Sequence, residues 1–467
     1  MKINPKTLEA YKLLHDGTLA FARSERQGIR VDEEYLETKI QHLTRRIDHM
    51  EKKFFNTKFY RHWEHTVKNR PNIYSNAQLG AFLYKVKKLS PVKLSTTGQG
   101  STDEEALLSL KIPELEKLIE IRRLKKNRDT YLKGFKRETV KGYLHPSFNL
   151  HLVRTFRSSS DRPNFQNIPK RDKEAMEITR RALYPRPGHQ LMEVDYSGLE
   201  VAIAATYHKD PNMIKYIKDP ASDMHADMAA QIFMIEGFDR SIPEHNRLRQ
   251  AAKNGFVFPQ FYGDYYGNCA EGLACKWGEL PAGTWKDTDG IKLPGEETLG
   301  AHLRKKGIKS LTKFTDHIKK IEEHFWETRF PDYAKWKERW WKLYQKYGYI
   351  DMHTGFRCSG IMGKNDAINY PVQGAAFHCL VWSYIQMDKI MQERSWQTRL
   401  IGQIHDAIIL DVHPEELDEV CRTIVQVTTK DLPAAWKWIN VPLHVDFELC
   451  GVDESWAEKK DFFPVLK

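Results

Sequence analysis

Residues 193–205, EVDYSGLEVAIAA, join two kinds of secondary structure around one carboxylate. The turn-forming PRPG at 185–188 and the apolar run before Asp195 predict a strand. The small and aliphatic residues after Gly198 predict a helix. Asp195 would then stand where the strand gives way to the helix, with its carboxylate facing a cleft. Taken by itself, an Asp in this position is more often a helix cap.

A second acidic turn lies far downstream, in LIGQIHDAIILDV at 400–412. Two β-prone apolar runs flank His405 and Asp406, which predicts a tight hairpin with Asp406 at its tip. Two Asp carboxylates brought together from distant strands suit Mg²⁺, which prefers carboxylate oxygens and keeps water or phosphate oxygens as further ligands. Two such ions, roughly 3.5–4 Å apart, assist phosphoryl transfer. We therefore expect Asp195 and Asp406 to form one site, although sequence spacing alone does not prove the pairing.

The composition describes a large and basic folded chain. Its 467 residues support two to four domains, and 73 Lys and Arg against 62 Asp and Glu give a net charge of +11. This excess is spread along the chain and favours a polyanionic partner. No apolar run is long enough to span a membrane, and the first residues lack the apolar core of a signal peptide, so we expect a cytoplasmic protein. The six cysteines form no CxxC pair, which predicts reduced structural thiols and no zinc site.

The first 140 residues are predicted to be mostly helical. Two amphipathic segments, 32–67 and 114–135, carry many Lys and Arg, and their basic faces suit a nucleic acid backbone. Each face taken singly is also compatible with ordinary solvated surface. Between them, 95–102 is predicted to be a flexible loop closed by a capping box of Thr102 and Glu105.

Arg249 and Lys253 lie in RLRQAAKNGFVFPQFYGDYY at 247–266. They are four residues apart, so on a helix they project from one face and can hold a triphosphate together. Aromatic residues that can stack on a base follow, and His225 stands on another predicted helix upstream. A basic pair is also common on solvated surface, and a lone His is often a buried core residue. The Gly-rich, polar residues 263–307 are predicted to be loop with little regular structure.

Two further stretches carry hydrogen-bonding groups that suit a groove of nucleic acid. TFRSSSDRPNFQNIP presents Arg157 and Asn167, and NDAINYPVQGAA places Asn369 and Gln373 four residues apart on a predicted helix. The first stretch, taken alone, is compatible with a plain long loop.

Together these stretches resemble the family A DNA polymerases, the group related to bacterial DNA polymerase I. EVDYSGLE, the RxxxK pattern with its following YG, and HDAIIL stand in the order and approximate spacing of that family's motifs A, B and C. TFRSSSDRPNFQNIP, NDAINYPVQGAA, GIRVD, NIYSNAQLG and STDEEAL also match. The resemblance covers nearly the whole chain from Gly28 onward, and the combination is far more specific than any single motif.

The resemblance implies an α+β right-hand fold with a helical thumb, an antiparallel-sheet palm and helical fingers. The implied divisions are a remnant or lead-in helix at 1–27, a thumb at 28–142, palm at 143–205, fingers at 206–346 with an expanded loop near 263–307, and palm at 347–467.

It also implies a template-directed DNA polymerase of replication or repair, which extends a primer with dNTPs by nucleotidyl transfer using two Mg²⁺ ions. The implied metal ligands are Asp195, Asp406 and the backbone carbonyl of Tyr196, and Lys253 joins the two acids as a catalytic residue. The implied dNTP contacts are Arg249, Lys253, His225, Phe258, Tyr262 and Glu200, the last beneath the incoming sugar. The implied contacts to primer-template DNA are Arg157, Asn167, Asn369, Gln373 and His405.

The chain departs from the usual family pattern at three positions. Members usually carry Gln where Gly198 stands, Arg at Ala202, and Glu at Ala407 directly after the motif C Asp. The third departure leaves two acids for the metal site and puts the role of an extra carboxylate in doubt.

Motif B is also longer than usual. The customary distance from its Lys to its Tyr is eight residues, and here Lys253 to Tyr262 is nine. Phe258 is then the best match to the aromatic residue that stacks on the incoming nucleotide, with Phe256 or Val257 as alternatives under another alignment.

Relatives often carry an exonuclease domain before the segment that begins here at Gly28. In this sequence fewer than thirty residues precede Gly28, so we expect no intrinsic proofreading. Three alternatives stay open: the exonuclease was never present, another chain supplies it, or it was removed. A processivity factor would likewise be a separate partner. Two other functions stay open: a primer-template binding protein without catalysis, which the two Asp residues with Arg249 and Lys253 disfavour, and an RNA polymerase or reverse transcriptase on the same fold. Glu200 disfavours ribonucleotides, whereas the sequence does not tell the preferred template. The expected location is the cytoplasm of a bacterial or phage-infected cell.

Overall fold

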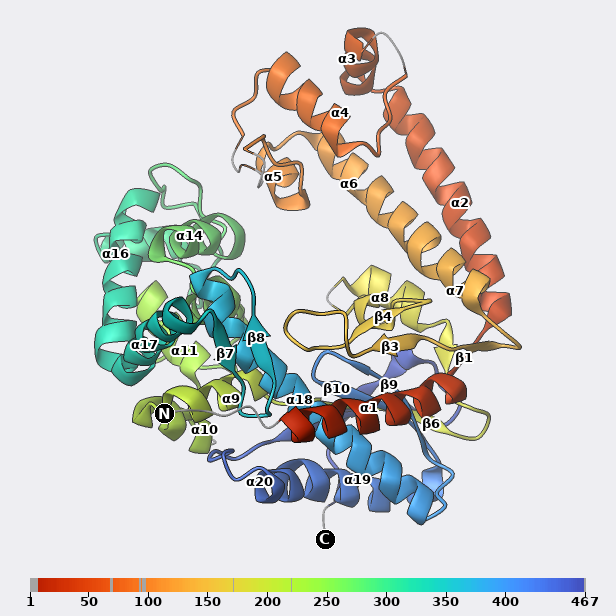
Figure 1. Ribbon diagram of the computed structural model, residues 1–467. Helices are drawn as coiled ribbons and strands as arrows, with labels where there is room; N and C mark the ends of the chain where they lie inside the picture. The colour runs from red at the N-terminus through yellow and green to blue at the C-terminus, as the bar shows by residue number, and fades with distance from the viewer. Residues whose placement is uncertain are drawn as a thin grey trace.

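A five-stranded antiparallel sheet lies at the centre of the molecule, in the order β12-β11-β6-β10-β9. This computed structural model describes residues 7–67, 70–91, 94, 98–170, 172–219 and 221–465. Figure 1 shows a pair of long helices, α2 and α6, rising from one side of the sheet, and a body of helices that includes α11, α14, α16 and α17 on the other side. The arrangement agrees with the expected right hand.

The central strand of this sheet is β6 (Gln190–Tyr196), and it carries Asp195 near its end, as predicted. The predicted hairpin is formed by β9 (Arg399–Ile404) and β10 (Ala407–Val412), with His405 and Asp406 in the two-residue turn. Strand β10 pairs with β6 on one side, and β11 (Val445–Leu449) pairs with it on the other. Nearly all of β6 is buried because it is the middle strand and helices α1 and α18 pack on the sheet through β9 and β10. The sheet therefore fixes the spacing between the two acidic turns.

Two of the helices that pack on the sheet lie far apart in the sequence. Helix α1 (Thr7–Gln27) contacts α18 (Lys364–Glu393), and Arg23 of α1 forms an ion pair with Asp388 of α18 at 2.5 Å. Pro371 lies inside α18, a helix of 30 residues. None of the helices in the described ranges is long and apolar enough to cross a membrane.

The long helical pair consists of α2 (Glu33–Phe55) and α6 (Pro113–Lys126). Asp32 caps α2, since its side chain accepts a hydrogen bond from the backbone N–H of Tyr35 at 2.8 Å. The predicted helix at 32–67 is broken after Phe55, and α3 (Lys58–Val67) turns back, which lets Trp63 stack on Phe82 with ring centroids 5.5 Å apart. The helix predicted at 114–135 continues past α6 through a π-helical turn at Asn127–Leu132 into α7 (Lys133–Glu138).

The predicted cap at Thr102 is wrong. Asp103 caps α5 (Glu104–Ser109) instead, accepting a hydrogen bond from the backbone N–H of Ala106 at 2.8 Å. Asp and Thr are both good caps, and the sequence placed two candidates side by side. Of the loop predicted at 95–102, residues 95–97 lie outside the described residues.

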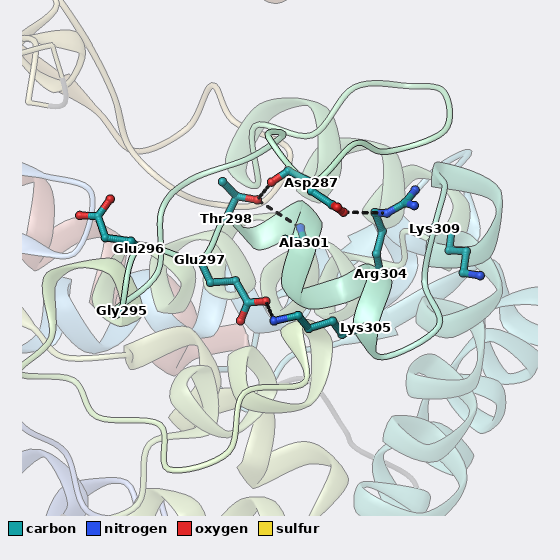
Figure 2. Close-up of a pocket in the computed structure, with 9 residues that line it drawn as sticks. All are labelled: Asp287, Gly295, Glu296, Glu297, Thr298, Ala301, Arg304, Lys305 and Lys309. Carbon is teal, nitrogen blue, oxygen red and sulfur yellow. Dashed lines mark hydrogen bonds and ion pairs between the residues drawn. The ribbon is translucent and has the colours of Figure 1, made fainter.

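Residues 263–307 were expected to be loop, and this expectation is wrong in part. They include α14 (Tyr266–Glu271), a π-helical turn at Gly272–Trp277 and α15 (Leu299–Lys305), with Trp285 fully buried. Figure 2 shows ion pairs between α15 and the residues before it: Arg304 pairs with Asp287 at 3.0 Å, and Lys305 pairs with Glu297 at 2.5 Å. The buried apolar residues of this segment are too widely and irregularly spaced to reveal a helical or strand period.

Helices α16 (Leu311–His324) and α17 (Pro331–Tyr347) complete this body, joined by a π-helical turn at Phe325–Arg329. The remaining helices are α4 (Asn76–Gly80), α8 (Lys173–Arg180), α9 (Leu199–His208), α10 (Pro211–Lys218), α11 (Met224–Phe233), α12 (Pro243–Ala252), α13 (Phe258–Tyr262), α19 (Leu417–Gln426) and α20 (Leu432–Ala435). The other strands are β1 (Ile29–Val31), β2 (Tyr143–Leu144), β3 (Ser147–Asn149), β4 (Ser159–Asp161), β5 (Leu183–Tyr184), β7 (Tyr349–Asp351), β8 (Arg357–Ser359) and β12 (Lys460–Phe462).

Candidate active site

The sheet brings the two predicted acids together. Ala407 pairs directly with Asp195 across β10 and β6, so Asp406 stands one residue beyond the pairing. The backbone N–H of Tyr196 donates to the backbone carbonyl of Asp406 at 3.2 Å. The Tyr196 side chain is buried, and its hydroxyl lies 2.8 Å from that of Ser383, so only the backbone of this residue can serve the site.

The electrostatics of the pair agree with this proximity. Burial raises the pKa of Asp195 to about 6; Lys170 opposes the shift, and the neighbouring charge of Asp406 adds to it. Burial also raises the pKa of Asp406, against the pull of Arg157 and His405. Two partly buried carboxylates that repel each other store a cost that a bound cation relieves. A bound cation would therefore lower the electrostatic cost of holding the two carboxylates together.

The donors fit a hard divalent cation. Asp195 and Asp406 supply carboxylate oxygens, and the carbonyl of Tyr196 lies beside them on the same strand. Mg²⁺ takes one or two carboxylates and fills its octahedron with water and phosphate oxygens. Among the residues that the structure describes, no group of three or more His, Cys, Asp or Glu side chains is arranged to hold a metal. An ion held by the two Asp residues would therefore depend on the substrate for further ligands.

Glu200 lies at the centre of a hydrogen-bonded network beside the acid pair. It stands in the first turn of α9, and its carboxylate accepts hydrogen bonds from the guanidinium of Arg157 and from the hydroxyl of Tyr262, the latter at 2.5 Å. Arg157 also reaches the backbone carbonyl of Gln373 at 3.5 Å, and the Asn369 side chain donates to the backbone carbonyl of Tyr262 at 3.2 Å. Five predicted site residues from four separate stretches therefore meet here.

A second cluster forms on α12 and α13. The side chain of Arg249 donates to Asp223 at 2.7 Å, and the ammonium of Lys253 lies 5.3 Å from the centre of the Phe258 ring. The rings of His225 and Phe258 are nearly perpendicular, with their centroids 5.7 Å apart. Burial and the two cations lower the pKa of His225 to about 4, so its imidazole is neutral near pH 7. The predicted triphosphate-binding residues and the predicted stacking residue are thus neighbours.

A π-helical turn explains the long spacing in motif B. Residues Lys253–Val257 form this turn, and the backbone N–H of Phe258 donates to the carbonyl of Lys253, five residues back. Pro259 follows, and its ring would clash with the carbonyl of Gly255 in a regular α-helix. The wide turn absorbs the additional residue, so Phe258 and Tyr262 stay in register with the basic pair. Phe256 and Val257, the alternatives for stacking, are fully buried, whereas Phe258 is half-buried.

A groove of about 660 Å³ runs between the α6 region and the loop before α8. Asn167 and His405 line it, together with Arg123 and Lys126 of α6. Some of the basic charge predicted for these helices is neutralised within the protein, because Arg123 pairs with Glu104 at 2.6 Å and with Asp172 at 3.1 Å. The groove is open, and basic side chains line it together with apolar ones, which is compatible with a polyanionic partner.

The two changed positions in motif A have clear local explanations. Gly198 adopts φ 62°, a left-handed conformation that favours glycine, at the start of α9. Ala202 is buried within the same helix, where a long basic side chain has no room without a shift of its neighbours. Ala407 is buried opposite Asp195 and adds no carboxylate.

The structure adds residues that the sequence did not single out. Lys170 lies 3.7 Å from Asp195 and 3.1 Å from Glu193. Asp446 stands directly across from Asp195 on β11 and accepts a hydrogen bond from the hydroxyl of Ser197 at 2.5 Å. The sequence did offer a signal for Glu193. Residues two apart on a strand point to the same face of the sheet, so Glu193 shares the face of Asp195.

Residues 33–458 match the sequence model of DNA polymerase family A. The chain belongs to this family. Among family A relatives, DNA polymerase I of Lactococcus lactis subsp. lactis is 30% identical over 395 residues, which is 83% of this chain and 40% of the relative. DNA polymerase I of Aquifex aeolicus is 28% identical over 440 residues, covering 94% of this chain and 65% of the relative. This family A chain thus spans less than two thirds of the length of these curated relatives.

A solved structure shows the family A fold. The POL domain of Pol1 from M. smegmatis, in complex with DNA primer-template and dNTP, has a TM-score of 0.72 and 23% identity, covering 95% of this chain and 70% of that one. The expected right-hand α+β fold is confirmed by this likeness.

Proposed function

We propose that this chain is a template-directed DNA polymerase that adds dNTPs to the 3′ end of a primer. The observation that carries the proposal is the meeting of Asp195 and Asp406 beside the network of Glu200, Arg157 and Tyr262. Tyr262 is on the same short helix as Phe258, so this network joins the acid pair to the basic cluster on α12 and α13.

In this proposal the incoming nucleotide lies along α12 and α13. Arg249, Lys253 and the neutral His225 hold the triphosphate. Phe258 and Tyr262 present their rings to the base. Glu200 lies beneath the sugar, with its carboxylate oriented by two donors. Membership of family A and the clustering of these side chains support the assignment.

Asp195, Asp406 and the carbonyl of Tyr196 would hold two Mg²⁺ ions, which supply neutralisation of the charge that develops on the transferring phosphoryl group. Lys253 and Arg249 add fixed positive charge at the same phosphates, so little reorganisation is needed as the reaction proceeds. Asp195 and Asp406 are catalytic residues in this sense, and Lys253 acts with them.

The primer-template occupies the groove between the α6 region and the sheet. Arg157, Asn369 and Gln373 face the minor groove near the nascent base pair, and Asn167 and His405 contact the primer strand. Arg123 and Lys126 lie where phosphates would pass. A separate exonuclease and a processivity factor are proposed as further partners, and the bacterial relatives favour the cytoplasm of a bacterial or phage-infected cell.

Primer extension by Asp195→Asn and Asp406→Asn variants tests the proposal. Both should abolish extension and leave primer-template binding largely intact, because phosphate contacts dominate affinity. Asp446→Asn is the matched control: it removes the same charge one strand away and should still extend. Near-normal extension by either active-site variant would show that the acids have been assigned wrongly.

The same assay separates the competing functions. DNA and RNA templates, each offered with dNTPs or NTPs, distinguish a DNA polymerase from a reverse transcriptase or an RNA polymerase. A wild-type protein that binds primer-template tightly and extends it under no condition would instead be a binding protein.

A further inference from the structure

Lys170 lies between Asp195 of the acid pair and a third carboxylate, the buried one of Glu193. Its ammonium lies 3.1 Å from Oε1 of Glu193 and 3.7 Å from Oδ2 of Asp195. One lysine can reach both carboxylates because Glu193 and Asp195 are two residues apart on β6 and point to the same face of the sheet.

Glu193 does not depend on Lys170 for its neutralisation. Its carboxylate is also held by Arg180 at 3.3 Å and by Lys459 at 2.5 Å, and both of these cations are nearly or fully buried. Asp195 differs, because its side chain is 41% exposed and, among the residues that the structure describes, Lys170 is the cation paired with it. The contact that Lys170 makes with Asp195 is therefore the exchangeable one.

Lys170 also has a path away from Asp195. Its side chain is half-exposed and lines the same groove as Asn167 and His405. The backbone before it is anchored, since the side chain of Arg180 donates to the carbonyl of Pro169 at 3.1 Å. A fixed backbone with a long flexible side chain lets the ammonium move between Asp195 and the groove without a change of fold.

We propose that Lys170 competes with divalent ions for Asp195 and, once an ion displaces it, turns into the groove and contacts the nucleic acid backbone. The inference rests on the metal site of the proposed function. Lys170 is a positioning residue in this scheme, because it acts through the ion and the bound strand.

The charges decide the direction of the effect. An ammonium and a divalent ion both gain from the charge of Asp195 and repel each other, so they exclude one another from that carboxylate. Without the ammonium, the ion no longer has to break the attraction between Lys170 and Asp195. Two unit charges about 4 Å apart in a well-solvated site attract by an amount equivalent to roughly fivefold in affinity, so the ion should bind roughly fivefold more tightly. An ion that displaces Lys170 frees its ammonium for the nucleic acid backbone. The ion and the nucleic acid should therefore strengthen each other's binding.

The first test is a titration of the full chain with Mn²⁺, with free Mn²⁺ measured by electron paramagnetic resonance in the absence of nucleic acid. Lys170→Met should bind Mn²⁺ roughly fivefold more tightly than wild type. Lys170→Arg, which keeps the charge, and Lys173→Met, which removes an exposed charge three residues away, should both match wild type. Thermal melting confirms that each variant is folded.

The outcomes separate this inference from the proposed function. Mn²⁺ binding that Asp195→Asn abolishes but Lys170→Met leaves unchanged would overturn the role of Lys170 alone. Mn²⁺ binding that is insensitive to Asp195→Asn would overturn the metal site and, with it, this inference.

The second test measures primer-template affinity against salt concentration with and without Mg²⁺. With Mg²⁺, the log-log slope of wild type should exceed that of Lys170→Met by about 0.9, the value for one phosphate contact. Without Mg²⁺ the two slopes should coincide, because Lys170 then stays on Asp195. Equal slopes in both conditions would refute the movement of Lys170 into the groove.

Discussion

Glu200→Ala should relax the choice between deoxyribonucleotides and ribonucleotides. Both oxygens of the Glu200 carboxylate accept hydrogen bonds, one from Arg157 and one from Tyr262, and these donors come from different parts of the chain. The carboxylate is therefore clamped in the position proposed for the sugar edge of the incoming nucleotide. A 2′-hydroxyl can enter only if the carboxylate moves or the sugar shifts.

The structure sets the size of this effect. Moving the carboxylate breaks at least one hydrogen bond to a charged group, which costs about 1.5–3 kcal/mol. Each 1.4 kcal/mol is a factor of ten, so the clamp should contribute between about 10-fold and 150-fold of the preference for dNTPs. Removing the side chain removes this barrier to ribonucleotides, together with some of the overall rate.

The assay is single-nucleotide incorporation, with kcat/KM measured for dATP and ATP on one primer-template. The ratio of the two should fall by about one to two orders of magnitude in Glu200→Ala. Tyr262→Phe breaks only the hydrogen bond to Oε2 and should give an intermediate ratio. An unchanged ratio in a Glu200→Ala protein that melts like wild type would refute the clamp.

Three other predictions follow from the same structure. Arg249→Ala should raise KM for dNTPs at least tenfold, because a charge-assisted contact to phosphate is lost, while Kd for primer-template stays near wild type; an unchanged KM would remove Arg249 from the triphosphate site. Lys126→Ala should lower the salt slope of primer-template binding by about 0.9, and equal slopes would mean that Lys126 contacts no phosphate. Burial lowers the pKa of His353 to about 4, so between pH 6.5 and 4 the unfolded chain binds a proton that the folded chain does not, and stability falls as pH falls. His353→Phe keeps the stacking on Tyr207 and should reduce that loss by about 1.4 kcal/mol per pH unit in urea unfolding, whereas parallel curves would show that His353 does not titrate in this way.

Local patterns predicted the parts of the site that depend on neighbouring residues. The strand into Asp195 and the hairpin around Asp406 both follow from apolar runs next to turn-forming residues, and both are present. Their approach to each other depends on the order of strands, which no spacing in the sequence reports. The family resemblance implied that the two acids share one metal site, and the structure supplies the strand order that brings them together.

Other features depend on contacts between distant residues and were missed. Lys170 reaches Glu193 only because the loop before α8 lies against β6, and no local pattern marks this approach. Asp446 was overlooked for a similar reason, since its place opposite Asp195 depends on the register of β11. In 263–307, the buried Trp285 packs on Phe314 but stands among polar residues in the sequence, so the polarity of the segment wrongly indicated an unstructured loop.

The π-helical turn at Lys253–Val257 separates the phases of two helical segments. In an unbroken α-helix, one inserted residue rotates everything that follows by about 100°, since 3.6 residues make one turn. Here such a rotation would carry Tyr262 away from Glu200. The wide turn takes up the extra residue, so the length of the helix and the direction of its side chains vary independently. Segment length in motif B is therefore a poor guide to whether two chains present the same face to a nucleotide.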